Sequence, residues 1–201
     1  MNVYVETNFV LELARQQEEF EFCQHILALH EQQAVNLILP AYSLVEPYET
    51  LIRHNRERRL LAERVSSELK QLGRSKPYQT EVSIHQTITD LLTRSGDEEL
   101  NRLNDIRDRL LQLVEIIPLT PDILAASIQL QNLQALSPQD AVVYASVLEH
   151  LAVNSGTKSC FLNRNAKDFA DVDIIKQLDM LNCKILFSFN QGYAYISSQI
   201  R

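Results

Sequence analysis

The sequence predicts an α/β fold in three layers, with a parallel sheet of four to five strands between two layers of helices. Four short runs rich in Val, Ile, Leu and Phe, at residues 2–5, 35–39, 158–162 and 183–187, are too short for helices. They lack clean alternation, which is typical of strands buried on both faces. Long helical patterns separate them, and this alternation of strand and helix favours a parallel sheet with right-handed crossovers.

The helices of the first half follow from apolar periodicity. Residues 8–33 predict two helices with a break between Arg15 and Glu18, and residues 44–72 predict one long charged helix. The segment Ser95-Gly96-Asp97 is expected to separate the next two helices. Those two helices are expected at about 80–95 and 97–114, and a brief fifth strand is expected at 115–117.

Two later helices begin with a polar cap residue followed by proline at the first helical position. Thr120-Pro121 opens a helix to about Leu133. Ser137-Pro138 opens a helix to about Val153.

Length and composition point to one globular domain over residues 1–201, with a helical insertion at about 50–120. The net charge of −7 argues against a surface that attracts nucleic acid everywhere. No apolar run reaches membrane-spanning length, and no secretory leader is apparent, so we expect a cytoplasmic protein without a membrane partner. Cys23, Cys160 and Cys183 lack metal-site spacing and are expected to be buried thiols.

Glycine usage excludes several enzyme classes. Only four glycines occur, all isolated, so no glycine-rich phosphate-binding loop can form. Nucleotide-cofactor and ATP-dependent functions are therefore disfavoured. The nucleophile elbow of α/β hydrolases is also absent.

Four acidic residues lie where apolar runs give way to polar or helical starts: Glu6, Glu46, Asp140 and Asp168. In a parallel sheet the carboxyl ends of the strands lie at one edge, and ligands bind beyond them. Carboxylates gathered there repel one another unless a cation lies between them. Their oxygens suit a hard divalent metal, so the sequence predicts Mg²⁺ or Mn²⁺ bound by these four residues.

Each acidic residue also has a structural interpretation. The dipole of the helix that follows Glu6 could stabilise its carboxylate. Ser43 with Glu46 fits a capping box. Asp140 could cap its own helix. Asp168 could be a solvated turn residue, with Asp171 or Asp173 in its place.

Four segments together resemble the PIN-domain family of metal-dependent ribonucleases, which includes the toxins of many bacterial toxin–antitoxin pairs. Val5-Glu6-Thr7-Asn8 resembles the Asp-Thr-Asn at the end of the family's first strand. Residues 39–46, ending in Glu46, resemble the second strand and its glutamate. Residues 137–145, with Asp140, resemble the helix bearing the third acidic residue, and residues 161–169 resemble the fourth strand and its polar turn.

Two features depart from the family pattern. Glu6 replaces the usual aspartate and adds a methylene, which shifts where a metal would be held. The stretch between Glu46 and Asp140 is longer than in the small toxins, and residues 50–120 match poorly.

The resemblance implies a PIN-like fold and an endoribonuclease in which Glu6, Asp140 and Asp168 surround one metal, with Glu46 joining directly or through water. Activated water would attack the phosphorus in line, leaving a 5′-phosphate and a 3′-hydroxyl. Asn8, Asn163 and Asn165 would orient ligands or water, and Asn165 competes with Asp168 as the fourth contact. An antitoxin protein and a second copy of the chain are the protein partners that the family implies.

A basic stripe would bind the RNA. Arg53, Arg56 and Arg59 recur at three-residue spacing in the helix after Glu46, and Arg164 lies in the fourth segment. The alternative for the stripe is a solvated helix face paired with neighbouring glutamates.

Three other functions use the same residues. A metal-dependent phosphatase or a DNase would need the same carboxylates. A PIN-like module that binds or scaffolds without cleavage would tolerate Glu6 in place of aspartate.

Overall fold

The computed structural model describes residues 1–79 and 85–200 and has one parallel sheet with strand order β3-β2-β1-β4-β5. Its strands are β1 (Asn2–Val5), β2 (Asn36–Pro40), β3 (Glu115–Ile117), β4 (Ser159–Leu162) and β5 (Cys183–Leu186). Val3 of β1 pairs with Leu37 on one side and with Cys160 on the other. The predicted fold class is confirmed, with the brief strand at 115–117 as the fifth member of the sheet.

The helices occupy most of the remaining described chain. They are α1 (Thr7–Arg15), α2 (Phe20–Glu31), α3 (Tyr42–Leu72), α4 (His85–Leu113), α5 (Pro121–Gln134), α6 (Pro138–Val153), α7 (Ala166–Phe169), α8 (Val172–Met180) and α9 (Phe189–Gln199), with a 3-10 turn at Lys76–Tyr78. The break after Arg15 is confirmed, because Gln16 adopts a left-handed conformation with φ of 55°. Helices α7, α8 and α9 were not among the predicted elements.

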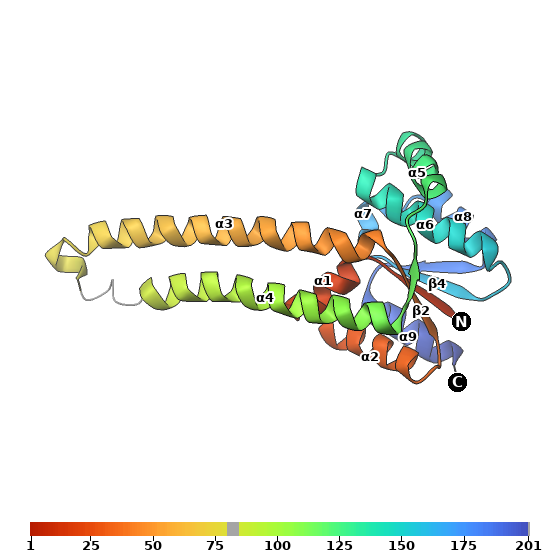
Figure 1. Ribbon diagram of the computed structural model, residues 1–201, viewed down its shortest axis with the longest axis horizontal. Coiled ribbons are helices and arrows are strands. Elements are labelled where there is room, and N and C mark those ends of the chain that lie inside the picture. Colours follow the sequence, from red (N-terminus) through yellow and green to blue (C-terminus); the bar gives the residue numbers. More distant parts are fainter. Residues whose placement is uncertain (80–84, 201) are drawn as a thin grey trace.

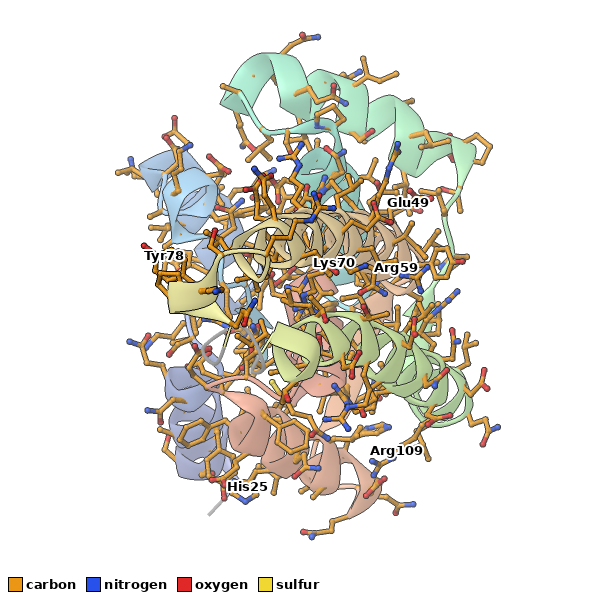
Figure 2. All side chains as sticks on the ribbon, turned by 90° about the vertical axis from the view of Figure 1, so that its left-hand side faces the viewer. His25, Glu49, Arg59, Lys70, Tyr78 and Arg109 are labelled. Carbon is orange, nitrogen blue, oxygen red and sulfur yellow. The ribbon has the colours of Figure 1, made fainter. Side chains whose placement is uncertain are left out.

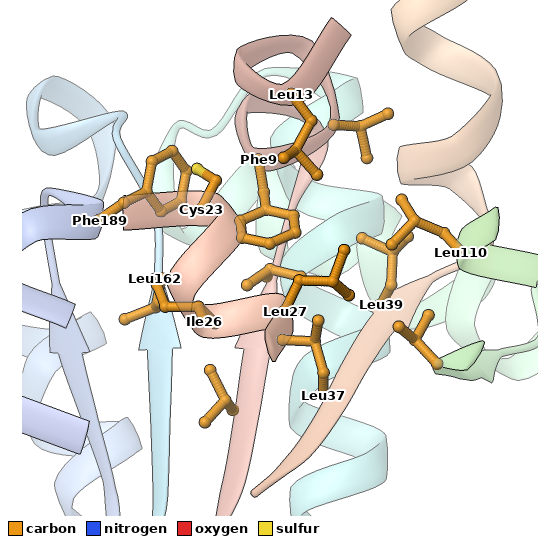
Figure 3. Packing of buried hydrophobic residues seen from close by; sticks show 14 of the residues in the cluster. Phe9, Leu13, Cys23, Ile26, Leu27, Leu37, Leu39, Leu110, Leu162 and Phe189 are labelled. Carbon is orange, nitrogen blue, oxygen red and sulfur yellow. The ribbon is translucent and has the colours of Figure 1, made fainter. Parts of the chain in front are cut away.

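Alternating strand residues divide the core between the two faces of the sheet. Val3 and Val5 face a cluster with Phe9, Ile26 and Phe189, from α1, α2 and α9. Figure 3 shows this packing, with Leu110 of α4 at its border. On the other face, Tyr4 and Phe161 pack with residues of α6, α7 and α8. Figure 1 shows the resulting layers, with α5, α6 and α8 on one side of the sheet and α2 and α9 on the other.

Helices α3 and α4 form a long antiparallel hairpin that projects from the layered body (Figure 1). The expected separation into two helices at Ser95-Gly96-Asp97 is wrong, because α4 runs through Gly96 without interruption. Gly96 allows a close approach of the two helices: Asn55 Nδ2 donates to the Gly96 carbonyl over 2.9 Å. The predicted start of this helix at residues 80–84 lies outside the described residues.

Polar contacts join the two helices of the hairpin to each other and to the body. Arg58 Nη1 lies 2.9 Å from Glu99 Oε1 and joins α3 to α4. Arg102 Nε donates to the carbonyl of Ala14 over 2.8 Å, which joins α4 to the last turn of α1. The base of the hairpin is therefore tied to the helix that follows the central strand.

Two expectations from composition concern cysteines and membranes. All three cysteines are buried and free, as predicted. Within residues 1–79 and 85–200, no helix combines the length and the apolar character needed to span a bilayer.

Candidate functional site at the carboxyl edge of the sheet

A cleft of about 570 Å³ opens beyond the carboxyl ends of β1 and β4. The strand order reverses between these two strands, and the helices that follow them cover opposite faces of the sheet. Such a switch point is where open parallel sheets bind ligands. The residues lining this cleft are Glu6, Thr7, Asn8, Leu11, Arg15, Glu46, Thr50, Asp140, Arg164 and Asn165.

Glu6 follows β1 and lies almost completely inside the protein, with 6% of its surface exposed. It is the N-cap of α1, since its Oε2 accepts a hydrogen bond from the Asn8 amide over 2.9 Å. Its other oxygen, Oε1, is buried and has no hydrogen-bond partner among the described residues. Burial raises the pKa of Glu6 from 4.5 to about 7, and the charge of Glu46 adds to the rise, although the amide and side chain of Asn8 and the backbone of Arg164 oppose it.

Glu46 reaches the cleft from the second turn of α3. The capping box of Ser43 and Glu46 does not form, because α3 already begins at Tyr42 with Ala41 as its N-cap. Thr7 Oγ1 instead donates to Glu46 Oε2 over 2.5 Å. Burial raises the pKa of Glu46, the Thr7 hydrogen bond opposes this rise, and the charge of Asp140 adds to it.

Asp140 lies in the first turn of α6, where Ser137 is the N-cap. The Ser137 hydroxyl accepts from the Asp140 amide over 3.1 Å and donates to Asp140 Oδ2 over 2.7 Å. Ser137 therefore caps α6, and the Asp140 carboxylate binds the hydroxyl of that cap residue and does not itself cap the helix. The same carboxylate also lines the cleft.

The turn after β4 brings Asn165 into the cleft. Its side-chain Nδ2 donates to Asp140 Oδ2 over 3.2 Å and to Asp168 Oδ2 over 2.8 Å. Asn163 is buried and holds this turn, because its Oδ1 accepts from the Asn165 amide over 2.8 Å. Asp168 is not among the residues that line the cleft and contacts it through Asn165.

The donor atoms of the cleft are of the type that binds a hard cation, but they do not converge on one point. Three carboxylates and two side-chain amide oxygens are ligands of the kind that Mg²⁺ and Mn²⁺ prefer, and the buried Oε1 of Glu6 has no hydrogen bond from another described residue. In the described part of the chain, however, no three Asp, Glu, His or Cys side chains are close enough to hold one ion together. The Glu46 and Asp140 carboxylates are instead engaged by Thr7, Ser137 and Asn165.

The two arginines of the cleft have different surroundings. Arg164 Nη1 contacts Glu12 Oε2 at 2.6 Å, and its Nε lies 3.6 Å from Glu19 Oε2. Glu12 is only 2% exposed, so Arg164 neutralises a buried charge. The other arginine, Arg15, ends α1 and reaches the cleft beside His54 of α3.

Sequence reasoning missed Arg15, Glu12 and Thr7. An arginine in the last turn of a helix is ordinarily explained by the helix dipole. Glu12 follows apolar residues within a predicted helix and not a strand, and Thr7 is not acidic. The one available signal for Thr7 was its place next to Glu6 in the family-like segment.

The predicted basic stripe lies on the hairpin and does not line the cleft. Arg53, Arg56 and Arg59 are all exposed on α3. Arg59 forms an ion pair with Asp97 of α4 at 2.9 Å. Figure 2 views the hairpin end-on and shows Arg59 and Lys70 on α3, with Arg109 of α4 well apart from them.

The fold and site thus define an α/β protein with an acidic cleft at the carboxyl edge of a five-stranded parallel sheet. No protein-family model matches the chain, and no curated protein matches it. Among solved structures, the chain is similar to one in the crystal structure of VapBC2 from Rickettsia felis bound to a DNA fragment from their promoter. The TM-score is 0.45 at 13% identity, over 92% of this chain and 99% of that chain. A likeness of this size does not assign a function.

Proposed function

We propose that the protein is a metal-dependent endoribonuclease that hydrolyses RNA phosphodiester bonds in the acidic cleft. One observation carries the proposal: Glu6, Glu46 and Asp140, which follow or face different strands, line a single cleft, and a buried oxygen of Glu6 has no partner there. Burying a carboxylate oxygen without a hydrogen bond is costly. A bound cation would remove that cost.

The proposed cofactor is Mg²⁺ or Mn²⁺. When bound, such an ion lowers the pKa of a coordinated water and offsets negative charge on a phosphodiester. Glu6, Glu46 and Asp140 would hold it, with Asn165 as the fourth donor in place of Asp168. Thr7 holds only Oε2 of Glu46, and Ser137 holds only Oδ2 of Asp140, so the second oxygen of each carboxylate would remain available to the ion.

The toxin role, an antitoxin partner, a homodimer and a cytoplasmic location belong to the same proposal. They depend on the resemblance of the four acidic segments to the PIN-domain family. The cleft supports the nuclease part of the proposal more directly than it supports these partners.

A second candidate is a module of the same fold that binds nucleic acid or scaffolds a complex without cleaving RNA. It is favoured by the separation of the carboxylates, which do not converge among the described residues. Metal titration distinguishes the two candidates. An intact site gains about 2.7 kcal/mol of unfolding free energy at a metal concentration about a hundred times its Kd, whereas a module without a site gains none.

The decisive assay incubates labelled RNA with the purified protein, with and without Mn²⁺, beside Asp140→Asn. We expect cleavage that requires the metal and that falls by at least about a hundredfold in the variant, since an ionised ligand is lost. Asp122→Asn is the matched control, because Asp122 also lies in the first turn of a helix but is exposed on α5. Equal cleavage by the wild type and Asp140→Asn would contradict the proposal.

A further inference from the structure

We propose that Arg15 forms a phosphate-binding subsite of the cleft and contacts a phosphodiester of a bound nucleic-acid strand. The proposal rests on the proposed function in one respect: the cleft takes nucleic acid. It assigns the phosphate contact within the cleft to Arg15, in place of Arg164.

The guanidinium of Arg15 retains unused donors at the wall of the cleft. An arginine has five N–H donors and cannot accept. Arg15 Nη2 donates to His54 Nδ1 over 2.6 Å, and this is its only hydrogen bond to another residue of the described chain. Its Nε is buried without a hydrogen bond and forms a long ion pair with Glu99 Oε2 at 3.9 Å, so the donors left for a ligand among the described residues are the remaining Nη hydrogens. A phosphate oxygen is the acceptor that such a forked set of donors suits best.

The local charge balance also leaves room for an anion. Glu99 is the acidic partner nearest to Arg15, but Arg58 already holds its Oε1 at 2.9 Å. His54 must be unprotonated at Nδ1, because it accepts from Arg15. Arg15 and Arg58 therefore share Glu99 in a largely buried position, with the Arg15 side chain 14% exposed. Glu12, the other carboxylate that acts on Arg15, is already paired with Arg164. Burial lowers the pKa of Arg15, Arg58 adds to this shift, and Glu99 and Glu12 oppose it, as expected for a buried cation beside a second one.

Arg164 has no comparable capacity. Its guanidinium lies against Glu12 and Glu19, so two carboxylates already balance its charge. A phosphate at Arg164 would have to displace a buried ion pair. A phosphate at Arg15 would fill unused donors and displace nothing.

The position of Arg15 fits a strand that also reaches the carboxylates. Arg15 lies at the end of α1, and Glu6 caps the beginning of the same helix. Thr50 of α3 lines the cleft with both. A helix of nine residues is about 13 Å long, so its two ends are well separated. Arg15 would therefore bind a phosphate near the reacting bond and not the reacting phosphate itself.

The test measures binding of a fluorescein-labelled single-stranded RNA by anisotropy, in EDTA to prevent cleavage, over a series of NaCl concentrations. For Arg15→Met we expect at least a tenfold loss of affinity. The slope of log K against log salt should become shallower by about 0.7, the value for one phosphate contact on a single strand. Arg15→Lys should keep most of the slope and lose affinity, because it keeps the charge and loses the fork. Arg109→Met, in which the altered arginine pairs with Glu31 away from the cleft, is the control and should leave both unchanged.

A second measurement uses the unaltered protein and does not depend on whether Arg15→Met folds. The Nε–H signal of Arg15, identified by its absence from Arg15→Lys, should shift in nitrogen–proton spectra on addition of the same RNA. A signal that stays in place, or an Arg15→Met protein that folds and keeps its affinity and salt slope, would overturn the inference. A shift with inorganic phosphate but not with RNA would overturn the assignment to nucleic acid. If RNA binding depends on Arg15 but no divalent ion brings cleavage, the subsite stands and the nuclease proposal fails.

Discussion

The two carboxylate oxygens of Glu6 have different surroundings. Its Oε2 caps α1, while its Oε1 is buried without a partner among the described residues. As an N-cap it is poorly chosen, since Ser, Thr, Asp and Asn satisfy a helix start with shorter side chains. A longer carboxylate that remains buried is better explained by a ligand that neutralises it.

The buried carboxylate of Glu6 predicts a pH-dependent gain in stability for Glu6→Gln. The folded pKa of about 7 lies above the ordinary value of 4.5, so the folded protein keeps its proton after the unfolded chain has lost it. The free-energy cost of ionising the buried Glu6 carboxyl group is absent below the unfolded pKa. It grows between the two pKa values and is complete above about pH 7. Without metal, Glu6→Gln should therefore raise the unfolding free energy by about 3 kcal/mol at about pH 8 and by little at about pH 4.

Urea denaturation in EDTA at the two pH values measures this difference. Mn²⁺ at about a thousand times its Kd should reverse the order at about pH 8, because it would add about 4.1 kcal/mol to the wild type and less to a variant that lacks the Glu6 carboxylate. A Glu6→Gln protein with the same stability as the wild type at every pH would show that the carboxyl group is not strained by burial.

At the scale of elements, the hairpin depends on one close contact between α3 and α4. A Cβ added at Gly96 would lie 1.8 Å from Asn55 Oδ1 and 2.5 Å from its Cγ. The buried Asn55 side chain occupies the space that a side chain at position 96 would need. Glycine there serves helix packing and does not end a helix.

This contact predicts that Gly96→Ala lowers the unfolding free energy of the wild type but raises that of the Asn55→Ala variant. Gly96→Ala gains about 1 kcal/mol of helix propensity, but it forces Asn55 to move and to lose its buried hydrogen bond, which costs about 1–3 kcal/mol. We expect a net loss of about 1 kcal/mol in the wild type. With Asn55→Ala already present, Gly96→Ala should instead stabilise the protein.

A double-mutant cycle by chemical denaturation measures this coupling. Additive effects of the two substitutions would mean that the two side-chain positions do not interact, contrary to the contact. The wild type, both single variants and the double variant complete the cycle.

Gly96 also marks where the sequence could mislead. A glycine between Ser95 and Asp97 has the local signature of a turn, and only the partner residue Asn55, far away in the chain, shows that it is a packing glycine. The strands were predictable because runs buried on both faces need no knowledge of a partner. Helices α7 and α9 are short or interrupted by polar residues, so their periodicity is weak.

The candidate site was predictable to a similar degree. Glu6, Glu46 and Asp140 follow from strand ends and helix starts, and they line one cleft. Whether their oxygens reach one point depends on rotamers and on contacts such as Thr7 with Glu46, which no spacing reveals. Arg15 could not be found because its significance depends on what Arg58 and Glu99 do at the hairpin.

At the scale of the whole molecule, a long two-helix arm extends from a compact body that holds the cleft (Figure 1). The arm is tied to the body at α1, the helix that also carries Arg15 and is capped by Glu6. A nucleic-acid strand in the cleft could thus continue along α3, where the basic stripe lies.

The basic stripe predicts a change in salt dependence. Arg56→Ala with Arg59→Ala should weaken RNA binding and make the slope of log K against log salt shallower by about 1.4, if each arginine contacts one phosphate. Arg107→Ala with Arg109→Ala, on α4, is the matched control. In both pairs one arginine forms an ion pair, at 2.9 Å for Arg59 and 2.6 Å for Arg109. Anisotropy titrations over several salt concentrations measure the slope. Equal slopes for both double variants would mean that the stripe is a solvated helix face that does not contact RNA.

The position of β1 at the centre of the sheet has a consequence for synthesis on the ribosome. Its partner β2 follows within forty residues, but its other partner, β4, is made only after residue 158. Until then the nascent chain carries an apolar strand with one edge open, and such edges pair with other chains. β1, which supports the cleft, thus remains without its second partner until β4 has been made, and a fragment released from a ribosome stalled before β4 would be prone to aggregation.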